Sequence, residues 1–266
     1  MLIRCCRRAG PALLVLVLLL TSAGCNGRIL GKQYEYQDDL HLALDGSATL
    51  TINASIASLA ALRGLDLDVS PSTRVSREVR DEIRAAYQSP VTEVTRVSPP
   101  WRRAGRPFVQ IQLKTSDVRR LAEVPALSWS RYELTGQGDQ HTFRQTVGAS
   151  ALRRGTLQNV GWTGSEIVAF RLHLPSRIRE HNARDLETNE TLAVARGNIL
   201  GWEQRLPDRL EGTPIAISVT MDSESILRRT LLLFGGAFAA ALAVLALLIW
   251  FTMLKGRKPG PTMPVP

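Results

Sequence analysis

The sequence predicts an α+β fold, in which a mostly antiparallel β-sheet and a few short helices form one domain, followed by one C-terminal transmembrane helix. Three observations lead to this expectation. Runs that alternate polar and apolar residues recur between turn residues, which is typical of half-buried strands. Helical patterns with capping residues interrupt these runs. An uncharged segment of 24 residues, 231–254, is long enough to cross a bilayer.

The first residues have the order of a secretory signal peptide. Three arginines precede the apolar run at 12–20, and small residues follow up to Cys25. Nine residues of helix span only about 14 Å, less than half of the hydrocarbon core of a bilayer. We therefore expect residues 1–24 to be removed on export, together with Cys5 and Cys6.

The segment Ser22-Ala23-Gly24-Cys25 resembles the lipobox of bacterial lipoproteins, in which the cysteine after the cleavage site carries the lipid. Ser22 departs from the usual Leu, Val or Ile. The resemblance implies that Cys25 is the lipid attachment site. The alternative is an ordinary signal peptide followed by an incidental cysteine.

A hairpin is predicted close to the start of the mature chain. Residues 39–44 and 48–54 alternate polar and apolar side chains, and Asp45-Gly46 stands between them as a two-residue turn. Two helices follow. Ser55 is expected to cap the first, which runs to Leu62, and Ser76 the second, at 77–88.

The remaining elements are predicted in chain order. Residues 99–107 form a loop between two strands, and Ser116 caps a short helix at 117–123. The predicted strands are 91–97, 108–113, 129–135, 141–147, 166–174 and 215–221. Residues 152–161 and 182–206 give no clear pattern.

The C-terminal segment 231–254 predicts a membrane-spanning helix of about 36 Å. The alternative, a buried core helix, does not explain the basic, proline-rich tail that follows. Lys255, Arg257 and Lys258 in this tail place residues 255–266 in the cytoplasm by the positive-inside rule. Residues 25–226 then form the extracytoplasmic domain of a protein of the cytoplasmic membrane.

Small residues recur along one line of this helix. Gly235, Ala239 and Ala243 stand four residues apart, a spacing that allows two membrane helices to approach closely. Self-association is one interpretation and chance in an alanine-rich span is the other, so the oligomeric state stays open.

The net charge of +9 belongs mostly to the two ends of the chain. Residues 26–254 hold 27 Lys and Arg against 24 acidic residues, which leaves about +3 for the domain. Nucleic acid as a partner therefore loses its main support.

Motifs for enzyme chemistry are absent from the sequence. The four histidines, His41, His141, His173 and His181, fall on different predicted elements. We expect no catalytic residues, no metal site and no cofactor, and we interpret the adjacent carboxylates Asp38 and Asp39 as solvated loop charge.

One basic loop has a physical interpretation. Trp101, Arg102, Arg103 and Arg106 lie in a proline-bounded segment. Arginine attracts anionic headgroups and an indole inserts at the interface, so this loop is a candidate for membrane or lipid contact. A solvated basic loop is the alternative.

Taken together, the lipobox, the Asp45-Gly46-Ser47 turn and the single C-terminal span resemble the LppM-type family of bacterial membrane-anchored lipoproteins. Leu174-Pro175 with Asn182, and the segment from Asn198 to Glu203, look like the late Asn-x-Leu-x-Trp segment of that family. The resemblance implies an α+β domain at the cell envelope that contacts lipids or glycolipids, without catalytic residues.

The sequence therefore favours a non-enzymatic envelope lipoprotein whose domain binds lipid, glycolipid or an envelope partner protein. The competing interpretation is an envelope-acting hydrolase or transferase whose acid and base are far apart in the sequence.

Overall fold

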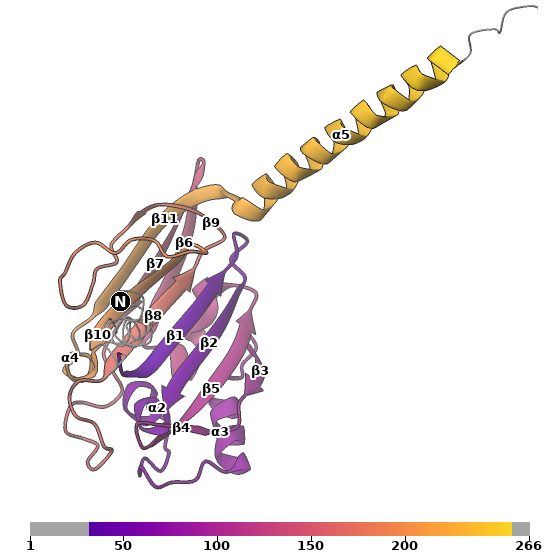
Figure 1. The fold of residues 1–266 in the computed structure, drawn as a ribbon. Coiled ribbons are helices and arrows are strands. Elements are labelled where there is room, and N and C mark those ends of the chain that lie inside the picture. The colour runs from indigo at the N-terminus through magenta and orange to yellow at the C-terminus, as the bar shows by residue number, and fades with distance from the viewer. Residues whose placement is uncertain (1–31, 257–266) are drawn as a thin grey trace, which may run out of the picture.

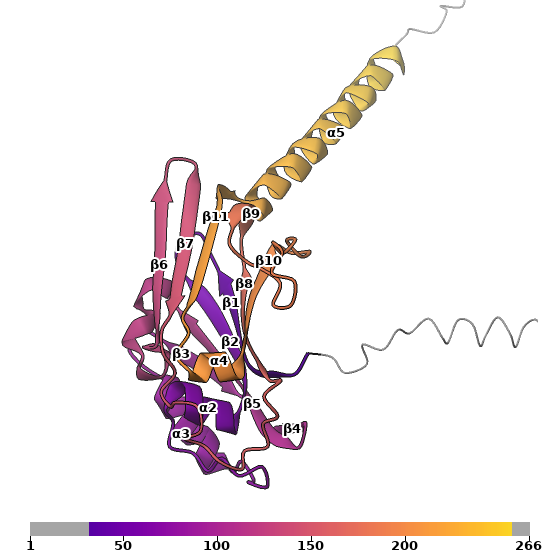
Figure 2. The same ribbon diagram turned by 90° about the vertical axis from the view of Figure 1, so that its left-hand side faces the viewer.

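The strands of the domain form two β-sheets that pack face to face (Figures 1 and 2). The computed structural model describes residues 32–256. The larger sheet has the strand order β10-β8-β1-β2-β5-β3, with β4 paired to β5. Its strands are β1 (Tyr34–Leu42), β2 (Ala48–Ser55), β3 (Glu93–Val97), β4 (Trp101–Arg103), β5 (Arg106–Thr115), β8 (Ile167–His173) and β10 (Ile199–Arg205).

The smaller sheet has the order β6-β7-β11-β9. Its strands are β6 (Ser130–Gln137), β7 (Gln140–Val147), β9 (Ser176–His181) and β11 (Ile215–Ser225). The short helices of the domain are α2 (Ile56–Arg63), α3 (Arg77–Tyr87), η1 (Val118–Glu123), η2 (Pro125–Leu127) and α4 (Leu206–Leu210). In Figure 2, α2, α3 and α4 gather at the end of the domain opposite the C-terminal helix α5. We call this end the base.

The strands alternate between a buried and a partly exposed face. In β1 and β2, Leu40, Leu42, Leu50 and Ile52 point toward the smaller sheet and are at most 5% exposed. The opposite face of the larger sheet carries polar side chains, and we call it the outer face. Apolar-in and polar-out alternation is the pattern of a sheet with one face in water. The sequence prediction of an α+β domain with mostly antiparallel strands is confirmed.

One strand pair is parallel and joins the two halves of the chain. β1 pairs with β8 in parallel register, with Asp39 opposite Arg171 and His41 opposite His173. β10 falls in the region 182–206, where the sequence shows no clear pattern, and β9 and α4 lie at the two edges of that region; none of the three is predicted from the sequence.

Two turns differ from their predictions. The β1–β2 connection closes through Ala43 and Ser47, and Gly46 alone in it has a positive φ, of 90°. It is a three-residue loop with a glycine bulge, so the predicted two-residue Asp45-Gly46 turn is wrong. The predicted loop at 99–107 is instead a hairpin of β4 and β5, turning at Ala104 and Gly105 with φ of 47° and 76°.

The helix caps mostly follow the sequence. Ser55 and Ser76 accept hydrogen bonds from the backbone N–H groups of Ser58 and Val79, as predicted. Gly64, with φ of 75°, ends α2. In η1, however, Asp117 and not Ser116 is the cap, because the Asp117 side chain accepts from Arg119 N–H.

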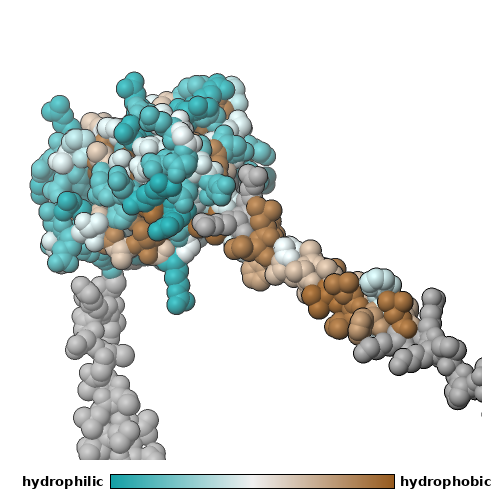
Figure 3. Space-filling view, turned by 90° about the horizontal axis from the view of Figure 1, so that it is seen from above, coloured by the Kyte–Doolittle hydropathy of each residue, from teal (hydrophilic) through white to brown (hydrophobic). Residues whose placement is uncertain are grey.

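The C-terminal helix α5 (Ile226–Gly256) continues directly from β11. Its segment Thr230–Leu254 is long and apolar enough to cross a membrane. Figure 3 shows a largely hydrophilic domain surface next to this hydrophobic helix. A C-terminal apolar helix was predicted, and the structure has it.

The core between the sheets contains a buried ion pair. Arg63 of α2 donates to Asp38 Oδ2 at 3.1 Å and to the Tyr36 hydroxyl, and both charged side chains are almost completely buried. The Arg63 guanidinium also lies 3.6 Å from the centre of the Trp129 ring. Asp38 is therefore a core residue, and its interpretation as solvated loop charge is wrong.

Replacing one partner of this pair leaves the other charge buried without compensation. We expect Arg63→Met to lower the free energy of unfolding by about 3–5 kcal/mol, and Asp38→Leu/Arg63→Met to lower it by less than the single variant. Denaturant unfolding of the detergent-solubilised chain measures both. If the double variant loses as much free energy of unfolding as Arg63→Met and Asp38→Leu lose together, this account is contradicted.

Candidate functional site

The predicted lipid-contact residues divide into two groups in the structure. Trp101, Arg102 and Arg103 form β4 and are exposed, with Trp101 stacked on Phe108 at a centroid distance of 5.9 Å. Arg103 donates to the backbone carbonyl of Lys32 at 3.1 Å. The β4 hairpin therefore lies beside the first described residue. Membrane contact by these three side chains stays a prediction.

Arg106 is not part of this exposed surface. It is only 3% exposed, and it donates through Nε and Nη2 to Glu35 Oε2, at 3.1 and 2.9 Å. Its Nη2 also lies 3.7 Å from Glu166 Oε1. The prediction that Arg106 contacts lipid is wrong, because its guanidinium is buried inside the domain, where it compensates the charges of two buried carboxylates.

We call Glu35, Arg106 and Glu166 the base ion cluster. Glu35 Oε1 accepts from Trp162 Nε1 at 2.8 Å, and Glu166 accepts from the backbone N–H groups of Thr163 and Gly164 at 2.7 and 2.8 Å. Arg106 Nη1 also donates to the carbonyl of Gly161. The cluster thus fixes the connection 148–166 onto the starts of β1, β5 and β8.

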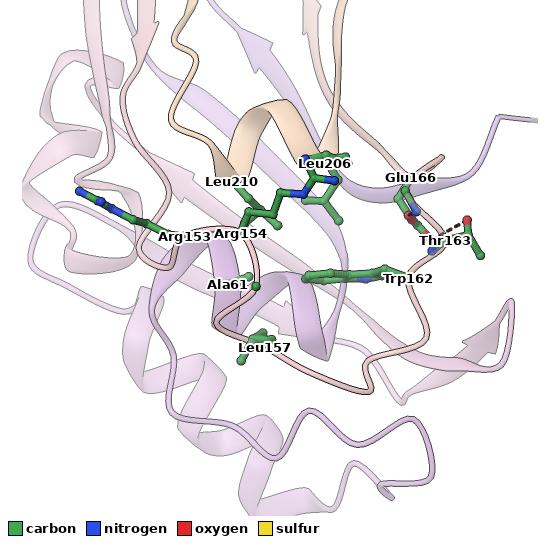
Figure 4. A pocket seen from close by; sticks show the side chains of 12 residues that line it. Ala61, Arg153, Arg154, Leu157, Trp162, Thr163, Glu166, Leu206 and Leu210 are labelled. Atoms are coloured by element: carbon green, nitrogen blue, oxygen red, sulfur yellow. Dashed lines mark hydrogen bonds between the residues drawn. The ribbon is translucent and has the colours of Figure 1, made fainter.

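Next to this cluster lies a pocket of about 290 Å³, which we call the base pocket (Figure 4). Its walls come from α2, α4 and the connection 148–166, with apolar side chains on about half of the lining and the polar side chains of Arg153, Arg154, Thr163 and Glu166 among the rest. The apolar side chains that line it are Ala61, Leu157, Trp162, Leu206, Pro207 and Leu210. A preformed pocket that combines apolar walls with polar groups at fixed positions is the usual form of a small-molecule site.

Arginines stand at the rim of the base pocket. Arg154 extends across the opening toward Leu206, whereas Arg153 points away from it (Figure 4). Arg154 Nη1 donates to Glu211 Oε1 at 2.5 Å. The backbone N–H groups of Leu152 and Arg154 donate to Ala61 and Leu210 and hold this rim in place.

A second concave site lies on the outer face. A groove of about 660 Å³ crosses β2, β1, β8 and β10, and the connection 192–195 forms one wall. His41 and His173 stack in it with a ring centroid distance of 3.8 Å, and His173 Nε2 lies 3.7 Å from Asp39 Oδ1. We call this the outer groove. These two histidines are 132 positions apart in the sequence and fall on different predicted elements. The parallel register of β1 and β8 brings them together.

The surroundings of His173 disfavour its charged form. Partial burial lowers the pKa of His173 below its ordinary value of 6.5, and the neighbouring His41 and Arg171 lower the pKa further. Asp39 opposes this by raising it. His173 therefore serves as a neutral imidazole with one donor and one acceptor nitrogen at neutral pH.

The late Asn and Trp residues have structural roles. Asn182 Oδ1 accepts from Trp202 Nε1 and from Ser218 N–H, both at 2.9 Å, and so links the two sheets. Asn198 adopts a positive φ of 54° and donates to the carbonyl of Ser176.

Several predicted residues are not tested by the structure. Cys25, Arg257 and Lys258 lie outside the described residues. Lys255 belongs to α5, and Gly235, Ala239 and Ala243 lie on its exposed surface. Their roles in lipidation, topology and self-association stay predictions. Within residues 32–256, no group of three or more His, Cys, Asp or Glu side chains has the arrangement of a metal site.

Comparisons with known proteins add a likeness of fold. No family model and no curated protein sequence matches the chain. One solved structure with a similar fold is the folded domain of LppM from Mycobacterium tuberculosis, determined by NMR. It is 10% identical, with a TM-score of 0.39, over 74% of this chain and 95% of that domain. The likeness concerns the overall fold, and the site assignments rest on the geometry above.

The two groups of arginines predict different effects on stability. Arg106→Ser leaves Glu35 and Glu166 buried and unpaired, so we expect it to lower the free energy of unfolding by about 3–5 kcal/mol. Arg103→Ser is the matched surface control and should change it by less than about 0.5 kcal/mol. Denaturant unfolding compares the two, and equal effects would refute the burial of Arg106.

The titration of His173 is the second prediction of this site. In an NMR titration of its ring protons in the full chain, we expect a midpoint below 6.5, because burial and His41 disfavour the imidazolium. Since the folded pKa is lowered, this group destabilises the fold as pH falls through 6.5 toward the folded pKa. Asp39→Asn should move the midpoint further down and His41→Gln should move it up. A wild-type midpoint above 6.5 would contradict the assignment.

Proposed function

We propose that this chain is a membrane-anchored envelope lipoprotein of non-enzymatic type, whose domain binds a lipid acyl chain in the base pocket. The observation that carries the proposal is the set of six apolar side chains in that pocket, with arginine at its rim. Burial of apolar surface stabilises a bound hydrocarbon by about 25 cal/mol per Å². The arginine at the rim suits an anionic headgroup.

The carboxylates beside the pocket support binding more than catalysis. Glu35 is held by Arg106 and Trp162, and Glu166 is held by two backbone N–H groups. These contacts to protein groups account for both carboxylates by a structural role, without a catalytic one. The competing envelope hydrolase or transferase therefore finds little support at the base pocket.

The two proposed anchors leave the base within reach of the bilayer. Ile167 N–H donates to Gln33 at the base, and Ile226 N–H at the start of α5 donates to Pro175 at the other end of β8. Eight residues of strand separate these points by about 26 Å. Lys32 is seven positions after a lipidated Cys25, and a chain of that length extends to about 25 Å.

The β4 hairpin belongs to the same proposal. Trp101, Arg102 and Arg103 lie beside Lys32, where the chain leads toward Cys25, so they are placed to meet headgroups when the base approaches the membrane. In the proposed topology, Lys255, Arg257 and Lys258 remain in the cytoplasm and the domain is extracytoplasmic.

Photo-crosslinking in a nanodisc tests the acyl-chain site. The full chain is reconstituted with phosphatidylglycerol and phosphatidylethanolamine that carry a diazirine at the acyl terminus. We expect cross-links on α5 and also on residues 153–164 and 206–210. Leu157→Trp, which fills the base pocket, should reduce the cross-links on residues 153–164 and 206–210 roughly tenfold or more. The cross-links on α5 should stay unchanged.

A matched surface variant controls for indirect effects. Arg131→Ser on the exposed side of β6 should leave both sets of cross-links unchanged. Cross-links confined to α5 in the wild-type chain would refute the lipid-binding function of the base pocket.

A further inference from the structure

We propose that the outer groove binds an uncharged oligosaccharide. This site is separate from the base pocket. The groove residue His173 lies at the far end of β8 from Glu166, seven residues or about 23 Å along the strand. The proposal therefore does not depend on lipid binding at the base.

The groove carries one acidic and one basic side chain, so its charge favours an uncharged ligand over a strongly charged one. Asp39 and Arg171 stand opposite each other in the β1–β8 register and both line the groove. An anionic ligand would meet the Asp39 carboxylate, and a cationic one would meet the Arg171 guanidinium. His41 and His173 are the other titratable groups that line the groove, and His173 adds no charge at neutral pH because burial lowers its pKa and so disfavours its imidazolium form.

The groove contains both hydrogen-bond donors and acceptors, which is the combination that the hydroxyl groups of a sugar require. Asn53 and Gln110 present side-chain amides, joined to each other by a hydrogen bond of 3.0 Å. Asp39 contributes acceptors, while Arg171 contributes donors. A sugar hydroxyl donates and accepts at once, so a row of such groups satisfies it where a purely apolar or single-charge surface does not.

The groove also has a flat aromatic surface and one strand position without a side chain. The stacked imidazoles of His41 and His173 provide a plane on which the C–H face of a sugar ring can lie. Gly201 continues the row of Thr51, Asp39 and Arg171 across the sheet, and it has no side chain there. A glycine inside a strand often marks a position where a ligand approaches the backbone closely.

The size of the groove and its wall fit a ligand of a few sugar units. Its volume of about 660 Å³ lies within the usual range for ligand sites, roughly 300–1,000 Å³. Leu192, Ala193 and Ala195 form an apolar wall at one side of the polar sheet. A solvated sheet face without a ligand needs no such wall.

The test uses trisaccharides that differ in charge. Triacetylchitotriose, maltotriose and mannotriose are uncharged, and deacetylated chitotriose is the cationic counterpart of the first. Trigalacturonic acid is the anionic probe. Saturation-transfer NMR with the full chain, in a detergent without a sugar headgroup, should detect at least one uncharged trisaccharide at millimolar concentration and neither charged one.

One variant blocks the groove without disturbing the fold. A Cβ at Gly201 meets nothing nearer than Arg171 Cγ at 3.9 Å, so the strand accommodates a side chain there. Gly201→Ile, a strand-favouring residue, should weaken trisaccharide binding roughly tenfold or more. Asp39→Ala should do the same by removing acceptors.

Two controls separate this site from other effects. Thr146→Ile, on the exposed face of β7, places the same residue type on the smaller sheet and should leave trisaccharide binding unchanged. Leu157→Trp, which blocks the base pocket, should also leave it unchanged. Absence of binding by every uncharged trisaccharide, stronger binding of a charged probe, or unchanged binding by Gly201→Ile would overturn the proposal.

Discussion

Arg106 is buried between Glu35 and Glu166 at the base of the domain. The position of the 148–166 connection depends on these two ion pairs. Two buried carboxylates without a cation would cost several kcal/mol, so the guanidinium and the backbone N–H groups around it are required together. Because Glu35 also holds Trp162, the same cluster sets one wall of the base pocket. The proposed ligand site is therefore a consequence of how the fold compensates its buried charge.

The parallel pairing of β1 with β8 determines the positions of the base ion cluster and of the histidine pair in the outer groove. It brings the start of β1 beside the start of β8 at the base, and it brings His41 beside His173 at the other end of the same strands. The base pocket thus lies beside the start of β8, and the outer groove lies on the larger sheet toward the other end of that strand. A lipid tether near the base and a helix at the opposite end would keep the domain close to the membrane along its length.

Local patterns in the sequence predict the elements that depend on local interactions. The serine caps of α2 and α3, the β6–β7 hairpin and the apolar C-terminal helix all follow from residues near one another in the chain. Contacts between distant residues are not predictable in this way. Arg106 follows a turn and has the sequence context of a surface residue, but its partners lie 71 and 60 positions away. The outer groove was missed for the same reason, since His41 and His173 meet only through long-range strand pairing.

The most direct measurement of the central claim is native mass spectrometry of the intact chain extracted from its own membrane. If the base pocket holds an acyl chain, one non-covalent phospholipid remains on the chain after detergent removal, in addition to any covalent lipid on Cys25. The retained lipid should be lost when the base pocket is filled, while the fold stays intact. A chain that carries no non-covalent lipid under conditions that preserve its fold would contradict the account.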